Sequence, residues 1–86
     1  MVTDVNPKDR IVRIDDVRYR IVAGRTGAYN VIRERDAAIV ADLCWMKTDA
    51  PEPQLFASPV GHAIPHALAN RIAEMAKTSR IVKPPP

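Results

Sequence analysis

The sequence predicts an α+β domain, in which an antiparallel β-meander of about four strands is packed on one face by a single C-terminal amphipathic helix. Three observations predict it. Segments rich in β-branched residues alternate apolar and polar side chains, short polar or glycine-containing turns separate them, and a later segment repeats apolar residues at helical spacing. The 86 residues, of which 47% are hydrophobic and 27% charged, provide one core and leave no room for a second domain.

The first predicted hairpin covers residues 10–23. Its second strand alternates strictly, and Asp15-Asp16 in the middle fits a two-residue turn. Such a turn pairs Ile14 with Val17 and places the apolar side chains of both strands on one face of the sheet. That face is the predicted core side.

A second hairpin is predicted around residues 24–27. A three-residue loop with Gly27 in the left-handed conformation is common in hairpins, because glycine has no Cβ to clash there. This loop pairs Ala23 with Tyr29 and brings the next strand onto the same core face. A phosphate-binding loop of the nucleotide-binding kind is a poor match, since that loop is longer and opens a helix.

Residues 37–44 support two interpretations. Ile39, Ala41 and Leu43 alternate as in a strand, whereas the alanines behind Asp36 as an N-cap suit a helix. We favour a fourth strand, because β-branched residues lie in its centre.

A helix is predicted over about residues 65–78, after a proline-containing surface linker at 47–54. Apolar residues follow one helix face at three-to-four spacing, and alanines flank this stripe. The alanines predict that another helix or sheet approaches closely. The predicted core consists of Val12, Ile14, Val17, Tyr19, Ile21, Tyr29, Val31, Ile39, Leu43, Phe56, Ile64, Leu68, Ile72 and Met75.

The predicted domain covers residues 10–80. Residues 1–9 mix polar residues and a proline without a period and predict a flexible N-terminal arm. Residues 81–86 are assigned to a proline-rich tail, and a short fifth strand that begins near Arg80 could run into it. Arg10-Ile11-Val12-Arg13 resembles residues 80–83, but four residues do not establish an internal repeat.

A cytoplasmic protein without a membrane span is expected. The longest apolar run has five residues, 37–41, against the roughly 20 that cross a bilayer. The first residues lack the basic and apolar regions of a signal peptide, and Cys44, the single cysteine, has no partner for an intramolecular disulfide.

Arginines on the outer face of the first hairpin are the candidate binding residues. Arg13 is predicted to lie directly opposite Arg18, and like charges opposed across a sheet are mildly destabilising. An acidic partner would offset this repulsion; a solvated face whose arginines pair with acids such as Glu34 is the simpler interpretation. The candidate site consists of Arg13, Arg18, Arg20 and Arg25.

Metal binding and catalysis are weakly supported. His62 and His66 are four residues apart, but Pro65 places only the second inside the helix. Cys44 could act as a nucleophile only if a histidine reached it, and a cysteine beside Trp45 is more often an apolar filler. We therefore expect no metal, no cofactor and no enzymatic activity.

The leading hypothesis is a small non-enzymatic interaction module, adaptor or inhibitor-like, that binds an acidic protein surface through these arginines. The alternative is a nucleic-acid-binding protein that contacts phosphates through the same residues. The net charge of +3 allows a polyanionic partner without demanding one. We expect a homodimer or a partner complex rather than a lone monomer, with an exposed strand edge at residues 10–14 or 38–43 for β-augmentation.

Overall fold

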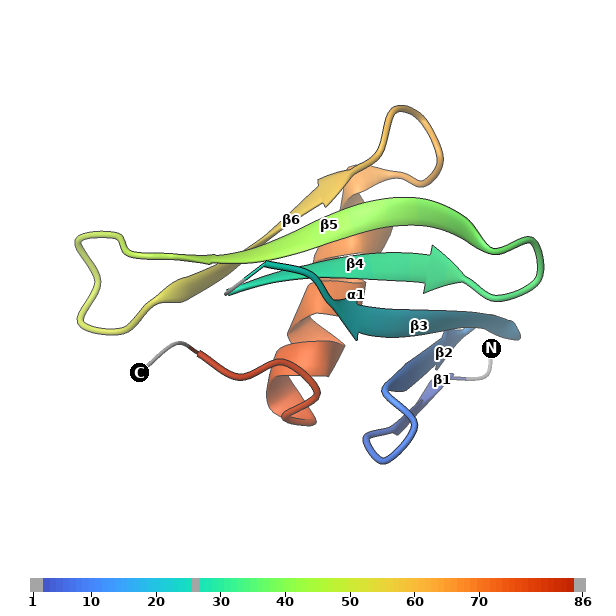
Figure 1. Cartoon of the computed structure of the whole chain (residues 1–86), viewed down its shortest axis with the longest axis horizontal. Coiled ribbons are helices and arrows are strands. Elements are labelled where there is room, and N and C mark those ends of the chain that lie inside the picture. Colours follow the sequence, from blue (N-terminus) through green and yellow to red (C-terminus); the bar gives the residue numbers. More distant parts are fainter. Residues whose placement is uncertain (1–2, 26, 85–86) are drawn as a thin grey trace.

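A computed structural model describes residues 3–25 and 27–84. Its strands form one antiparallel sheet in chain order, and the helix lies against one face of this sheet (Figure 1). The α+β class and the meander are confirmed, but the described residues form six strands where about four were predicted. The strands are β1 (Thr3–Asn6), β2 (Ile11–Ile14), β3 (Val17–Ala23), β4 (Ala28–Arg33), β5 (Ala38–Met46) and β6 (Gln54–Pro59), and α1 spans His66–Thr78.

Both predicted hairpin turns are confirmed. Asp15 and Asp16 have φ angles of 53° and 66°, the left-handed pair that a two-residue hairpin turn requires, and Ile14 pairs with Val17. In the next turn Gly27 has a φ of 77°, and Ala23 pairs with Tyr29. The turns fix the register of β2, β3 and β4, so that one face of these strands is apolar and packs in the core. This face consists of Val12, Ile14, Val17, Tyr19, Ile21, Tyr29 and Val31.

The fourth predicted strand is confirmed as β5, but its pattern is broken by a β-bulge. Val31 pairs with Ala41 and Ile32 pairs with Ile39, which leaves Val40 as the extra residue on β5. Val40 and Ala41 are consequently both fully buried, whereas Ile39 is 48% exposed on the opposite face. The prediction of Ile39 as a core residue was wrong, because strict alternation does not hold across a bulge.

Two strands were missed, one at each edge of the sheet. Residues 3–6 form β1 and pair with β2, where the sequence indicated strands only from Arg10 onwards. Residues 54–59 form β6 and pair with β5, so the surface linker ends at Pro53. Because β1 and β6 cover the outer edges of β2 and β5, the expected free edges at residues 10–14 and 38–43 are wrong.

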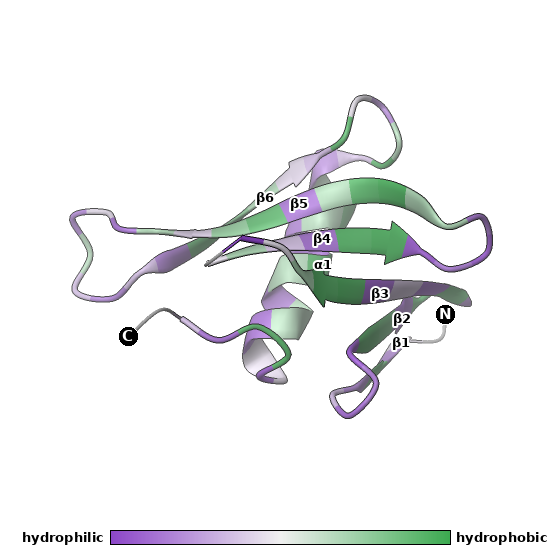
Figure 2. Cartoon of the chain, in the orientation of Figure 1, coloured by the Kyte–Doolittle hydropathy of each residue, from purple (hydrophilic) through white to green (hydrophobic). Residues whose placement is uncertain are grey.

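The core lies between the sheet and α1, and Figure 2 shows the hydrophobic residues concentrated in the strands and the turns mostly hydrophilic. Phe56, predicted to be core, is instead 46% exposed, because its partner Cys44 faces away from α1. The other twelve predicted core residues are buried in this cluster or packed against it: Val12, Ile14, Val17, Tyr19, Ile21, Tyr29, Val31, Leu43, Ile64, Leu68, Ile72 and Met75.

The helix begins directly after Pro65, as predicted, with extended backbone at that proline. Ala69, Ala73 and Ala76 are buried in the chain's own core, so they do not form the predicted surface for a second helix or sheet. The small alanine side chains allow α1 to lie close to the sheet, so that a short helix covers it. Among the described residues, no helix has the length and apolar character needed to cross a membrane.

Candidate functional site

Arg13 and Arg18 lie opposite each other on the face of the sheet that α1 leaves uncovered, as predicted. Arg13 donates a hydrogen bond to the Asp4 carboxylate of β1 over 2.6 Å. The missed strand β1 thus supplies an acid that offsets the repulsion between the two arginines. Because Arg13 and Asp4 are both partly exposed, this pair contributes at most about 1 kcal/mol.

Glu34, just after β4, holds the next two arginines. Its carboxylate lies 3.2 Å from the Arg18 guanidinium and 2.7 Å from that of Arg20. Arg20 also donates to the carbonyl oxygen of Asp9 in the β1–β2 turn. Three of the four predicted binding arginines therefore have acidic partners within the chain, while Arg25 lies in the β3–β4 loop with no ion pair to a described residue.

A second basic surface, which the sequence did not predict, lies at the end of the sheet where the β1–β2 turn meets the segment after α1. Here a hollow of about 410 Å³ is lined by cations from both segments and by Tyr29. No carboxylate lines it, and its four cations form no ion pair with any residue the structure describes. We call these four residues the basic edge: Lys8, Arg10, Arg80 and Lys83.

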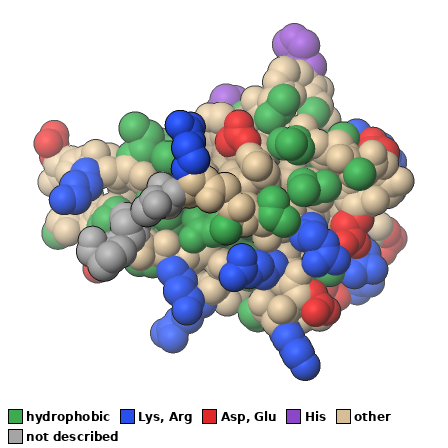
Figure 3. All heavy atoms as spheres, in the orientation of Figure 1, with side chains coloured by type: hydrophobic (Ala, Val, Ile, Leu, Met, Phe, Trp, Pro, Cys, Tyr) green, Lys and Arg blue, Asp and Glu red, His purple; other side chains and the backbone are tan. Residues whose placement is uncertain are grey.

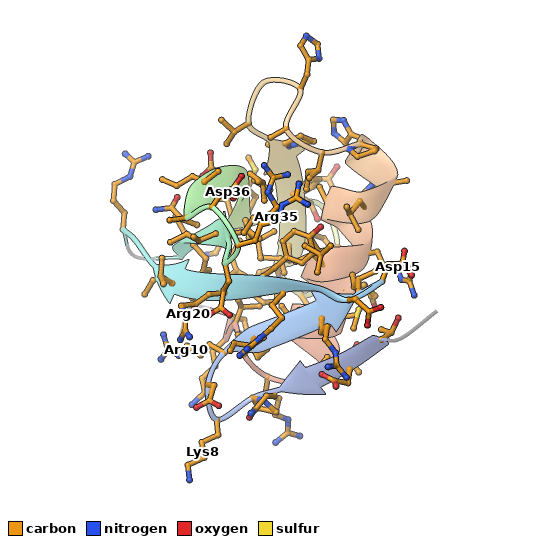
Figure 4. The ribbon with its side chains drawn as sticks, turned by 90° about the vertical axis from the view of Figure 1, so that its right-hand side faces the viewer. Lys8, Arg10, Asp15, Arg20, Arg35 and Asp36 are labelled. Carbon is orange, nitrogen blue, oxygen red and sulfur yellow. The ribbon has the colours of Figure 1, made fainter. Side chains whose placement is uncertain are left out.

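The basic edge is continuous with the uncovered face of the sheet. Figure 3 shows Lys and Arg side chains gathered along the lower margin of this face, and Figure 4 shows Arg10 and Arg20 on the side away from α1, with Lys8 below them. The carboxylate of Asp9, between Lys8 and Arg10 in sequence, accepts a hydrogen bond from the side chain of Asn6. It forms no ion pair with either of these two neighbours.

The backbone at the basic edge is strained. Arg10 and Arg80 have φ angles of 58° and 60°, a left-handed conformation that costs a residue with a Cβ about 1–2 kcal/mol. Arg80 follows the last turn of α1, where the amide of Ile81 donates to the carbonyl of Ala76, the helix end that usually carries glycine. Two arginines thus occupy positions that favour other residues, and both line the same hollow.

Replacing Arg80 with glycine is expected to leave the free energy of unfolding unchanged or raise it by up to about 1 kcal/mol. The relief of left-handed strain is offset by the greater entropy of glycine in the unfolded chain. Urea unfolding measures the change, with Lys77→Gly inside α1 as a control that costs about 1 kcal/mol. A loss of more than about 1 kcal/mol for Arg80→Gly would mean that this side chain stabilises the fold.

A second, larger hollow adjoins the basic edge and shares Arg80 and Lys83 with it. Its volume is about 670 Å³, and Trp45 of β5 forms part of its wall. Trp45 belongs to both the core and the surface, since the partly buried ring packs against the core and lines the hollow. Its other lining residues are Glu52, Pro53, Gln54, Lys77, Val82 and Pro84.

The signal that could have revealed the basic edge was the likeness between residues 10–13 and 80–83. In both segments an arginine in the left-handed conformation precedes an Ile-Val pair that is buried. Ile81 and Val82 are therefore packed in the domain and form no strand, whereas the sequence placed the tail from residue 81 onwards. Pro85 and Pro86 of that tail lie outside the described residues.

Three groups outside the basic edge have shifted pKa values. A hydrogen bond from Arg33 lowers the pKa of Asp36 below its ordinary value, and the same bond raises the pKa of Arg33. The pair ties the end of β4 to the β4–β5 turn. Burial raises the pKa of Tyr19. Two of the shifts therefore follow from the Arg33–Asp36 hydrogen bond and the third from burial in the core.

No protein-family model matches the chain, and no match was found among curated proteins or solved structures. The argument for a function therefore depends on the geometry of the described residues.

Metal and thiol chemistry gain no support from that geometry. In residues 3–25 and 27–84, no three His, Cys, Asp or Glu side chains gather in a way that could hold a metal ion. The two histidines, purple in Figure 3, lie at the top of the molecule, on the loop before α1 and at its first residue. Cys44 is exposed and its thiol donates to the carbonyl of Trp45.

The uncovered face also carries exposed apolar side chains, including Ile39 and Phe56. Figure 3 shows hydrophobic groups across the middle of this face, above the basic margin. Apolar groups beside a basic margin are typical of an interaction surface. The chemistry of this arrangement suits an anionic partner.

Proposed function

We propose that this chain is a non-enzymatic binding module that contacts the phosphates of a nucleic acid along the basic edge. The observation that carries the proposal is the gathering of Lys8, Arg10, Arg80 and Lys83 around one hollow. None of the described residues that line this hollow carries a carboxylate. Unpaired cations that are crowded together repel one another, and an anionic polymer removes this repulsion while it releases its own counterions.

The arginines of the first hairpin extend this surface. Arg18 and Arg20 share the single carboxylate of Glu34, so one positive charge is left over on that part of the face. Exchanging an exposed intramolecular ion pair for a phosphate contact costs little, because such pairs contribute about 0–1 kcal/mol. Arg13, Arg18, Arg20 and Arg25 are therefore secondary contacts in the proposal, and the basic edge is the primary one.

An acidic protein segment is the second candidate partner, because carboxylates satisfy the same cations. The hollow beside Trp45 favours nucleic acid over an acidic segment. Nucleic acid combines repeated negative charges with flat bases, and the chain places an aromatic wall next to its unpaired cations. An acidic peptide would use the cations and leave this wall without a function.

Fluorescence anisotropy with a short labelled single-stranded DNA, titrated at several salt concentrations, tests the proposal. If about four phosphates are contacted, the logarithm of the association constant should fall with the logarithm of salt concentration with a slope of about −3. A labelled poly-glutamate peptide is the comparison.

Tighter binding of the DNA than of the peptide, with this slope, supports the proposal. Tighter binding of the peptide would mean that the basic edge binds an acidic protein partner. The absence of DNA binding at low salt would reject the nucleic-acid function. Light scattering on the same samples tests the expected self-association, because a monomer has a mass of 9.5 kDa.

A further inference from the structure

The hollow beside Trp45 combines two kinds of wall. Val82 and Pro84 of the C-terminal segment supply apolar surface next to the indole, and Arg80 and Lys83 from the same segment supply positive charge. The two kinds of residue alternate along residues 80–84, so a molecule in the hollow contacts both. At about 670 Å³ the hollow is within the size range of sites that hold small organic molecules.

The indole of Trp45 has an unsatisfied polar group. Its Nε1 is buried and has no hydrogen-bond partner among the described residues. A buried indole N–H usually has a partner, and leaving it without one is unfavourable. A phenylalanine at this position would supply apolar packing without this unpaired N–H.

These walls select among anionic ligands. A free phosphate ion or a carboxylate would use only Arg80 and Lys83, and an apolar molecule would leave both cations without a partner. A nucleotide has a flat ring that stacks on an indole and a phosphate for the cations. Of these three classes, only a nucleotide uses both the indole and the cations Arg80 and Lys83 of a hollow that Glu52 and Lys77 also line.

We infer that the hollow takes one nucleotide of a single-stranded nucleic acid, with the base against Trp45 and the phosphate at Arg80 and Lys83. The inference rests on the proposed function and adds a preference for single strands to it. A base inside a duplex is already paired and stacked, so it cannot enter the hollow unless it is flipped out at additional cost. A duplex therefore reaches only the basic edge.

The test compares a labelled single strand with a duplex of the same sequence, using the wild-type chain and Trp45→Leu. We expect the wild type to bind the single strand at least about 10-fold more tightly, and Trp45→Leu to weaken single-strand binding by roughly 10- to 100-fold, the loss of one base stack. Duplex binding should change by less than about 2-fold, since phosphate contacts carry it. Val60→Ala is the control, because Val60 is an exposed apolar residue that lines neither hollow.

Three outcomes separate the inference from the proposed function. Equal binding of single strand and duplex by the wild type overturns the inference and leaves the phosphate-binding function intact. An equal loss for both nucleic acids in Trp45→Leu also overturns it, once circular dichroism has established that the variant is folded. Absence of binding to either nucleic acid rejects both.

If Trp45→Leu does not fold, two further measurements test the inference. They are the binding of nucleic acid by Trp45→Phe and the fluorescence of Trp45 in the wild-type chain. Trp45→Phe retains an aromatic ring and should keep most of the single-strand preference. Since the chain has one tryptophan, a short oligonucleotide should quench its emission directly, whereas inorganic phosphate should not. Quenching by both to the same extent would overturn the inference.

Discussion

Replacing Arg10 and Arg80 together with glutamate is expected to weaken the binding of single-stranded DNA by at least about 100-fold. Each reversal removes one attraction to a phosphate and adds one repulsion, and a tenfold change per position corresponds to about 1.4 kcal/mol. Both residues line the hollow between the β1–β2 turn and the C-terminal segment, so the two reversals act on one surface. Fluorescence anisotropy at low and moderate salt measures the effect.

The double variant should remain folded. Arginine and glutamate both carry a Cβ and adopt the left-handed conformation at a similar cost, so the substitution changes the charge and leaves the backbone requirement the same. The salt dependence should also become shallower, since two fewer phosphates are contacted. A double variant that keeps the wild-type affinity and slope would exclude the basic edge as the binding surface.

The matched control is Arg13→Glu with Arg18→Glu on the first hairpin. These residues have carboxylate partners in Asp4 and Glu34, so their reversal should weaken DNA binding by less than about 10-fold. If this pair abolishes binding while the basic-edge pair does not, the site predicted from the sequence is the functional one.

The central part of the fold could be predicted because short-range signals determine it. The turns at Asp15-Asp16 and Gly27 each allow few loop geometries, and each geometry sets one register. The helix could be predicted because its apolar spacing is long and Pro65 marks its start. In both cases the relevant residues are close together in the sequence.

The edges of the sheet and the basic edge could not be predicted in this way. Strand β1 has little hydrophobic alternation, and it is stabilised by pairing with β2 and by the ion pair between Asp4 and Arg13. The cations of the basic edge come from opposite ends of the chain, so no local spacing indicates that they meet. Only the similarity of the two Arg-Ile-Val segments hinted at a shared environment, and a likeness of that length is expected by chance.

The bulge in β5 is the point at which strict alternation and the structure disagree. The disagreement can be tested, because the two registers predict very different losses of stability for substitutions at Val40 and at Ile39. Replacing Val40 with aspartate is expected to destabilise the fold by more than about 4 kcal/mol, because it buries a carboxylate without a partner where the structure has a fully buried side chain. Ile39→Asp should cost only about 1 kcal/mol, since Ile39 is 48% exposed. Strict alternation through Ala41 predicts the reverse order, with Ile39 in the core and Val40 outside.

Urea unfolding of both variants decides between the two registers, and alanine variants extend the comparison if Val40→Asp does not fold. Val40→Ala should cost about 2 kcal/mol through lost burial and a small cavity, and Ile39→Ala should cost less than about 1 kcal/mol. A larger loss for Ile39 in either pair would mean that β5 runs without a bulge. In that case Val40 would move to the uncovered face and Ile39 into the core, and the apolar surface above the basic margin would lose one of its exposed members.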